Sequence, residues 1–558
     1  MKRMPWSGAL PVLLALVAAA ALGRTPAYAA TIVVTTTADE LNADGDCSLR
    51  EALEAANQDL AVDACPAGSG ADTITLPAGI FTLTRVDDPA TFDDDLTTGD
   101  LDIIGDLTLS GAGTGVTTID AAGLDRAIAV WQSPTATIAN LSVTGGSSGV
   151  RAGSGIWVSS STLTLDRVRV FGNEPQGGIF IIGTSSLTLT GSRIDQNIGS
   201  GIVTQSTTTL TVINSVISGN TNDSNGGGID STGTTTIVNS VISGNATEES
   251  GGGIDSTGTT TIVNSTISGN RAEKSGGGVN MNFGTTSLYN VTIAANMANN
   301  LSSSLFGGGG VAVNAPGALA AQNALIAGNQ GDRQASGTSH DCLGTITSGG
   351  YNLIEQPAGC TLAGNTAGNI SGQNPALGPL QNNGGGTSTH GLALGSPAID
   401  AGNPLGCVDG ASSPLTLDQR GVARTSRCDI GAYEASASTP TSTPTSTRTA
   451  TSTSTPTATA MRTPVDGQPP STPTATSTST PTATAMRTPV DGQPPSTPTA
   501  TSTSTPTATA TATRTAVDGQ PTGTPQATPG VEAPEISTAT PPAASQLPQR
   551  VYLPLVHH

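Results

Sequence analysis

A repeat of 25 residues limits what this chain can fold into. Residues 226–245 read GGGIDSTGTTTIVNSVISGN, residues 251–270 read GGGIDSTGTTTIVNSTISGN, and looser copies follow at 276–296 and 307–329. Earlier copies end near Asn173, Asn197 and Asn220. Each copy contains three short strand-like pieces separated by Gly, Asn or Thr-Gly turns, with no helical periodicity. Repeats of this kind stack into solenoids in which each unit contacts only its neighbours.

Comparison of the copies predicts which side chains point inward. Three columns stay aliphatic in every copy: Ile229, Ile254 and Val279; Ile237, Ile262 and Leu288; Ile242, Ile267 and Ile293. The neighbouring columns vary, because Val238 and Val263 become Tyr289, and Val241 becomes Thr266 and Thr292. We expect the aliphatic columns to fill a narrow interior and the variable columns to face out. Aromatics at 3% also suit a thin core, so we expect an all-β, three-sided parallel β-helix.

Asparagines mark the corners of the expected coils. They form two columns: Asn214, Asn239, Asn264 and Asn290; Asn220, Asn245, Asn270 and Asn296. Asn tolerates the left-handed conformation that a sharp corner needs, and its amide can bond to the next coil. We therefore favour structural turns over glycosylation or ligand sites. The runs 226–228 and 251–253 lack the Lys-Ser/Thr of a phosphate loop, so they too are expected to be turns.

Residues 1–30 are predicted to be an export signal. Lys2 and Arg3 precede an apolar stretch over 9–22, and Ala27-Tyr28-Ala29 supplies small residues for cleavage after Ala29 or Ala30. A membrane-spanning helix is the less favoured reading, because the apolar run is short. No other segment of the sequence is long and apolar enough to span a bilayer. We expect an extracellular or cell-surface protein.

Six cysteines fall into three pairs that are local in sequence: Cys47 with Cys65, Cys342 with Cys360, and Cys407 with Cys428. Fifteen connectivities are possible, and the local scheme is the simplest. A zinc site is the alternative, but no nearby Cys or His completes a tetrahedral set. We expect structural disulfides, each contributing about 3 kcal/mol.

Motifs at the two ends of the repeat region resemble known families. Residues 47–52 read CSLREA and are followed by Ala56-Asn57, which resembles the hallmark of CSLREA-domain proteins. Residues 377–402 together with 418–421 (DQRG) and 428–434 (CDIGAYE) resemble the choice-of-anchor Q domain. The stacked GGGI turns resemble polymorphic outer-membrane proteins and other pectin-lyase-like β-helices. These resemblances span about residues 31 to 435 and imply a right-handed β-helix on a secreted protein, but no chemistry.

The end motifs also predict local structure. Ser48 and Glu51 form a capping box, and Leu49, Ala52, Leu53 and Ala56 form one apolar helix face. Arg50 belongs to the same CSLREA motif. Such a helix can cover the exposed strand edges of the first coil. At the other end, we expect residues 378–434 to close the last coil. There Arg420 has three candidate partners, Asp400, Asp418 and Asp429, beside Glu434 of the same motif. An active site in DQRG is less favoured than a structural corner.

The repeats contain no recognisable catalytic constellation. The four histidines, His340, His390, His557 and His558, all lie outside the stacked repeats, and no base accompanies the acidic column. That column contains Asp230 and Asp255 one coil apart, with Asn280 above and Asp195 expected below. Repulsion between the two carboxylates could be relieved by Ca²⁺, which makes them the candidate metal ligands. The acid-rich stretch Asp87, Asp88, Asp93, Asp94, Asp95 and Asp100 is predicted to be a solvated loop rather than a metal site. We assign no catalytic or cofactor-binding residue.

The C-terminal part of the chain differs in composition. Thr, Ser, Pro and Ala dominate residues 436–549, which cannot bury apolar surface and are predicted to form a disordered stalk. Residues 550–558 are a short apolar ending that resembles C-terminal tags of other stalked secreted proteins. The expected order is therefore signal peptide 1–30, cap and first coils 31–100, repeats 101–335, last coils and closing segment 336–435, stalk 436–549 and tag 550–558.

These features predict a non-enzymatic surface protein that is adhesive or structural and is displayed on the stalk. Expected partners are an envelope or extracellular polysaccharide or a surface protein, and we expect a monomer. The net charge of −20 argues against nucleic acid. The alternatives are a polysaccharide lyase or hydrolase on the same fold, and a calcium-stabilised glycan-binding module. Exposed faces rich in Thr, Ser and Asn suit glycans, although aromatic residues are few.

Overall fold

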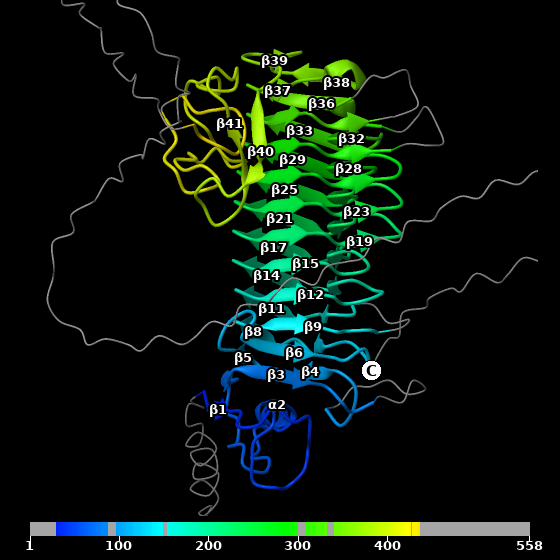
Figure 1. The fold of residues 1–558 in the computed structure, drawn as a ribbon, viewed down its shortest axis with the longest axis vertical. Helices are drawn as coiled ribbons and strands as arrows, with labels where there is room; N and C mark the ends of the chain where they lie inside the picture. The colour runs from blue at the N-terminus through cyan, green and yellow to red at the C-terminus, as the bar shows by residue number, and fades with distance from the viewer. Residues whose placement is uncertain are drawn as a thin grey trace, which may run out of the picture. The chain divides into compact units, whose positions relative to one another are not determined.

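A computed structural model describes residues 29–86, 96–148, 153–299, 307–331, 340–425 and 427–435. The predicted signal peptide (except Ala29 and Ala30), Asp87 to Asp95, the stalk and the C-terminal tag lie outside the described residues. In the described part, parallel strands pair from coil to coil in four ladders, which build a parallel β-helix (Figure 1). The predicted fold class is therefore confirmed.

Sheet 1 carries the longest strands of the repeats and runs the whole length of the helix. Its strands are β1 (Thr31–Val33), β2 (Asp72–Thr75), β5 (Leu107–Ser110), β8 (Thr135–Ala139), β11 (Thr162–Asp166), β14 (Ser186–Thr190), β17 (Thr209–Ile213), β21 (Thr234–Val238), β25 (Thr259–Val263), β29 (Thr285–Tyr289), β33 (Ala318–Gln322), β36 (Cys342–Gly350) and β38 (Cys360–Gly364).

Sheet 2 follows sheet 1 in each coil across a sharp corner. Its strands are β3 (Gly79–Thr82), β6 (Thr117–Asp120), β9 (Ser142–Thr144), β12 (Arg169–Phe171), β15 (Arg193–Asp195), β18 (Val216–Ser218), β22 (Val241–Ser243), β26 (Thr266–Ser268), β30 (Thr292–Ala294), β34 (Leu325–Ala327), β37 (Leu353–Ile354) and β39 (Ile370–Ser371).

Sheet 3 completes each coil and joins sheet 1 through the shared strand β36. Its other strands are β4 (Leu101–Ile103), β7 (Ile128–Val130), β10 (Ile156–Ser159), β13 (Ile179–Ile182), β16 (Ile202–Thr204), β20 (Ile229–Ser231), β24 (Ile254–Ser256), β28 (Val279–Met281) and β32 (Val311–Val313). A short sheet 4 lies between sheets 2 and 3, with strands β19 (Thr221–Asn222), β23 (Ala246–Thr247), β27 (Arg271–Ala272), β31 (Met297–Ala298) and β35 (Gln330–Gly331).

The three predicted aliphatic columns form the core. Ile229, Ile237 and Ile254 have no solvent exposure, and they belong to one continuous cluster along the helix. Because alternate residues of a strand face opposite sides, each strand offers the narrow interior only one or two side chains. The variable columns do face out. However, Val241, Thr266 and Thr292 are buried all the same, because another part of the chain covers them.

Both asparagine columns build corners, in two different ways. Asn214, Asn239, Asn264 and Asn290 have φ between 49° and 56°, which confirms the predicted left-handed turns between sheets 1 and 2. The asparagines of the second column do not have a positive φ. The residue before each of them takes it instead: a glycine such as Gly244 in three coils, and Ala295 before Asn296. Its side chains form a buried ladder in which Asn245 Nδ2 donates to Asn270 Oδ1 (3.0 Å) and to the Ile217 carbonyl (3.0 Å).

The N-terminal motif forms the predicted helix α2 (Leu49–Gln58). Ser48 Oγ accepts a hydrogen bond from Glu51 N (3.2 Å), and Glu51 Oε2 accepts one from Ser48 N (2.9 Å), so the capping box is confirmed. Leu49, Ala52, Leu53 and Ala56 are buried in the same cluster as the coils. Figure 1 shows α2 at the N-terminal end of the stack.

Arg50 fastens this helix to the first coils. Its guanidinium is fully buried, pairs with Asp39, and donates to the carbonyls of Leu96 (3.1 Å) and Gly99 (2.6 Å). Buried charges are tolerated when they are paired and fully hydrogen-bonded, as this one is. Asp100 is also buried, and it accepts a hydrogen bond from Arg126 Nε (2.6 Å). For Asp100, therefore, the prediction of a solvated loop was wrong.

The segment 377–435 does not close the last coil, contrary to our expectation. It starts with an antiparallel pair, β40 (Leu377–Gln381) and β41 (Thr389–Leu392), and runs back along the side of the helix (Figure 1). Ala398 and Ile430 pack against Leu325 and Leu353. Thr266 Oγ1 donates to Gln419 Oε1 (2.6 Å), far from the end of the stack. The segment covers outward residues of sheet 2 that the sequence marked only as variable.

Three disulfides join the cysteines in the predicted local scheme: Cys47–Cys65, Cys342–Cys360 and Cys407–Cys428. The first fixes the loop after α2, the second joins β36 to β38, and the third closes a loop of the side segment. No other cysteine exists, so the zinc alternative has no thiolate left. A short 3-10 helix, η1 (Pro357–Gly359), precedes Cys360.

Candidate functional site

The two predicted metal ligands lie side by side on the outer face of sheet 3. Asp230 of β20 and Asp255 of β24 are register partners in adjacent coils. Asn280 follows in β28, as predicted, and its Nδ2 donates to Asp255 Oδ1 (2.6 Å). Asp195 is not below them: it lies in sheet 2, where Arg169 Nη2 pairs with it at 2.8 Å. The register partner of Asp230 in the preceding coil is Val203 instead.

Burial and mutual repulsion change the acidity of this pair. Burial, followed by the charge of Asp255, raises the pKa of Asp230 to about 7. Burial raises the pKa of Asp255 to about 6, although the Asn280 amide opposes the change. Near neutral pH the pair can therefore exchange one proton, hold a cation, or accept hydrogen bonds from a ligand.

Aromatic side chains continue the same column, a feature that reasoning from the sequence missed. Val203 pairs with Phe180 of β13, and Phe180 pairs with Trp157 of β10. All three are half-buried on the outer face, whereas Ile156 and Val158 beside Trp157 are fully buried. Two aromatic residues of the chain, Trp157 and Phe180, thus lie in the same column as its acidic pair.

Charged and polar groups lie around the N-terminal end of this column, near Trp157. The Arg126 guanidinium lies 5.0 Å from the centre of the Trp157 ring while it is paired with Asp100. Trp131 Nε1 donates to Asp102 Oδ1 (2.7 Å), and Asp102 is the register partner of Ala129 in the same column. Two of the three tryptophans of the chain, Trp131 and Trp157, therefore lie on or beside this face.

A hollow of about 260 Å³ lies between the aromatic and acidic parts of the column. Phe180, Val203 and Asp230 form its floor, and loops carrying Gln176 and Asp223 form its sides. Its volume is somewhat below the range of pockets for drug-sized ligands, which fits one sugar ring. We call this the Asp230 hollow.

The side segment leaves sheet 3 open. Within the described residues, its hydrogen bonds to the coils reach sheet 2 and the corner between sheets 1 and 2. Asn264 Nδ2 donates to the Leu417 carbonyl (3.2 Å), and Asn290 Nδ2 to the Val408 carbonyl (2.9 Å). A second hollow of about 530 Å³ lies between this segment and sheet 1, beside Tyr289 and Leu415.

The C-terminal motif residues make contacts within the side segment. Of its three candidate partners, Arg420 pairs with Asp418 (2.6 Å), and its guanidinium lies 3.6 Å from the centre of the Tyr433 ring. Asp429 Oδ1 accepts from Asp400 N (2.7 Å). Glu434 pairs with Arg424 (3.2 Å), a buried partner that the sequence reading did not identify.

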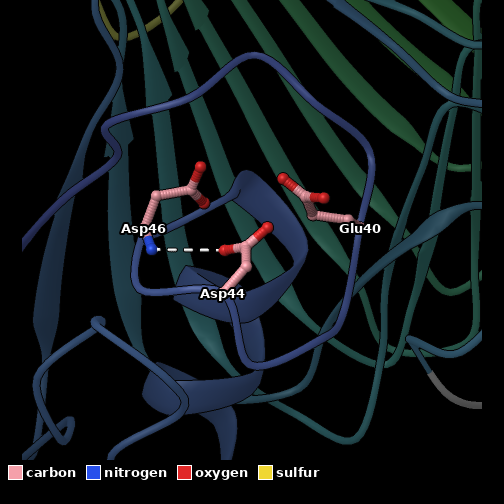
Figure 2. A group of neighbouring side chains, drawn as sticks. All are labelled: Glu40, Asp44 and Asp46. Atoms are coloured by element: carbon pink, nitrogen blue, oxygen red, sulfur yellow. Dashed lines mark hydrogen bonds between the residues drawn. The ribbon is translucent and has the colours of Figure 1, made fainter.

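A third group of acidic side chains lies near α2. One carboxylate oxygen from each of Glu40, Asp44 and Asp46 lies within 4.8 Å of the others, and Asp46 N donates to Asp44 Oδ1 at 3.3 Å (Figure 2). Loss of solvent, followed by repulsion from Asp44, raises the pKa of both Glu40 and Asp46. Exposed acidic groups at this spacing are common, and we assign no ion to them.

One comparison with known families supports the architecture. A family model described as "Right handed beta helix region" matches residues 126–297. A search of curated proteins finds no significant match. In the described residues, no helix is long and apolar enough to cross a membrane.

Several solved structures are similar at low identity. The pectate lyase Pel9A is 14% identical, with 73% of this chain and 97% of that chain covered and a TM-score of 0.41. The A-module of mannuronan C-5 epimerase AlgE4 from Azotobacter vinelandii is 15% identical, with 58% and 92% covered and a TM-score of 0.35. The PL6 family alginate lyase AlyGC is 13% identical, with 65% and 55% covered and a TM-score of 0.29. Likenesses of this size carry no conclusion about function.

Proposed function

We propose that this protein is a secreted, surface-displayed β-helix that binds a saccharide along sheet 3 without turning it over. The observation that carries the proposal is one in-register column: Trp157, Phe180, Val203, Asp230, Asp255 and Asn280. A sugar needs both a flat apolar platform for its ring face and fixed polar groups for its hydroxyls. The column offers both, with neighbours about 4.8 Å apart along the helix.

Non-catalytic binding is favoured by what surrounds the acidic pair. A lyase needs a basic side chain close to its carboxylates to remove a proton from the sugar. Of the described residues lining the Asp230 hollow, none is Lys, Arg or His. Asn280 occupies the next position of the column and contributes an amide only.

Display at the cell surface rests on features outside the β-helix. The predicted signal peptide, the Thr/Pro-rich stalk and the C-terminal tag fit a protein held away from an envelope. Three disulfides are compatible with an oxidising extracellular compartment. The resemblances to CSLREA-domain and choice-of-anchor Q proteins point the same way. In this proposal the protein acts as a monomeric adhesin for an extracellular polysaccharide, or for a glycan on a surface protein.

One observation favours a polysaccharide hydrolase as the second candidate. Asp230 and Asp255 are stacked carboxyl groups whose pKa values rise to about 7 and about 6, so one can carry a proton beside an ionised neighbour. Such a division of roles is what an acid–base pair needs. In a third arrangement, Ca²⁺ binds between the two carboxylates, relieves their repulsion and stabilises glycan binding.

The test is a glycan array probed with the mature full-length chain, with and without Ca²⁺, followed by assays for released reducing or unsaturated sugars. We expect retention without product. Phe180→Ala should weaken retention at least about tenfold, as expected for losing an aromatic platform. Phe283→Ala is the matched control, because Phe283 is a 56% exposed aromatic outside the column. Product that disappears in Asp230→Asn would instead establish the hydrolase.

A further inference from the structure

The Asp230 hollow combines acidic charge with an apolar floor. Asp223 and Asp230 both line it, and Asp255 lies behind Asp230 in the next coil. The basic groups of neighbouring coils are paired elsewhere: Arg126 with Asp100, Arg169 with Asp195, and Lys274 with Glu249. An anionic sugar such as a uronate would therefore meet uncompensated negative charge.

The polar lining also offers mainly acceptors. Asn222 Nδ2 donates to Ser200 Oγ (2.8 Å) and to the Asn225 carbonyl (2.7 Å), which uses both of its hydrogens. Ser200 Oγ in turn points its hydrogen at the Asn225 carbonyl (3.5 Å). The acceptors that remain for a ligand are the carboxylates and the Asn222 side-chain carbonyl, beside the exposed Gln176 amide and Ser224 hydroxyl. Because the charged groups of the lining are all carboxylates, a ligand with hydrogen-bond donors and positive charge fits them best.

The apolar floor separates an organic cation from a bare metal ion. Phe180 and Val203 offer no oxygen to a hard cation such as Ca²⁺, which prefers six to eight oxygen ligands. An ammonium group has three donors and no acceptor, and it is attracted to the face of an aromatic ring. A hollow of about 260 Å³ also exceeds what a single ion needs.

We infer that the Asp230 hollow takes the protonated amino group of an amino sugar, with the sugar ring resting on Phe180. This inference rests on the saccharide-binding function proposed above and names its ligand class. Aminosugar polymers without N-acetyl groups would be preferred, because acetylation removes both the charge and two of the donors. Uronates would be excluded.

The test is calorimetric titration of the full-length chain at pH 7 with short oligomers, which limits nonspecific binding to a protein of charge −20. The probes are the trisaccharides of glucosamine, N-acetylglucosamine and galacturonate, and a trilysine peptide. We expect the glucosamine trisaccharide to bind at least about tenfold more tightly than its N-acetylated form, as for a charge-assisted hydrogen bond.

Two variants separate the site from general charge attraction. Asp230→Asn should abolish most of this preference, and it should fold because Asn280 already occupies the same column. Asp59→Asn removes the same charge at the exposed C-terminal end of α2, at a left-handed position that suits Asn, and should leave the preference unchanged.

The outcomes are distinct. Equal binding of both trisaccharides, or equal loss in the two variants, would overturn the amino-sugar inference and leave saccharide binding intact. The inference would also be overturned if the galacturonate trisaccharide, in the presence of Ca²⁺, bound more tightly than the glucosamine trisaccharide. The same holds if trilysine bound more tightly than the glucosamine trisaccharide. Absence of binding to every saccharide here and on the array would overturn both proposals.

Discussion

Folding stability should fall as pH rises through neutrality, and Asp230 should be a main cause. Its pKa rises from 3.8 in an unperturbed carboxyl to about 7 in the folded chain. The folded state therefore holds this proton between about pH 4 and pH 7, where the unfolded state has lost it. Stability from this group is fully present below about pH 4 and is lost as pH rises towards and above 7.

The size of the effect follows from the change in pKa. About three pKa units correspond to about 4 kcal/mol of free energy of unfolding, lost by about pH 8. A folded unit of about 400 residues unfolds with an entropy of about 0.8 kcal/mol/K, so this amounts to about 5 °C in Tm. Asp230→Asn mimics the protonated carboxyl. Because the unfolded wild type has already released most of this proton at pH 5, the variant should melt about 2 °C above the wild type at pH 5 and about 5 °C above it at pH 8.

Differential scanning calorimetry between pH 5 and pH 8.5 checks this expectation. Asp59→Asn serves as the control, because its side chain is exposed and far from the pair in the stack. If wild type and Asp230→Asn lose stability in parallel across this range, burial beside Asp255 does not govern the proton on Asp230. The electrostatic reasoning about the hollow would then be wrong.

Three further predictions concern the parts that hold the site in place. Asn245→Ala should lower the free energy of unfolding in urea by about 3–5 kcal/mol. The buried Asn220 N–H donates to Asn245 Oδ1 (3.1 Å), so the substitution leaves this N–H without a partner and breaks the asparagine ladder. Ser48→Ala should cost about 1 kcal/mol by removing the N-cap of α2, whereas Ser48→Thr should restore most of it. Arg420→Met should release the side segment, so that limited proteolysis cleaves between 377 and 435 before the coils; equal resistance in variant and wild type would contradict that role.

The side segment decides which face of the β-helix is accessible to a ligand. By packing against sheet 2 and the corner asparagines, it covers outward residues such as Thr266 and leaves the aromatic and acidic column uncovered. Had residues 378–434 closed the last coil as predicted, both faces would have stayed open. The segment therefore makes the faces of an otherwise regular helix unequal.

The sequence by itself determined the interior and the corners of the coils. Inward columns such as Ile229 and Ile254 follow from a period of two within each strand, and corners such as Asn239 follow from the left-handed conformation that Asn accepts. The capping box of Ser48 and Glu51 is equally local. These features depend on residues a few positions apart, so an internal comparison of repeats is enough to find them.

Only the tertiary structure decided which outward side chains share a face. The coils before Asp230 differ in length, so alignment of the sequence alone set Asp195 beneath it, whereas the hydrogen-bonded register puts Val203, Phe180 and Trp157 there. The same holds for Arg424, which meets Glu434 and Asn264 across a docked segment. Such contacts come from the stacking of coils and the packing of one segment on another, and no local pattern encodes either.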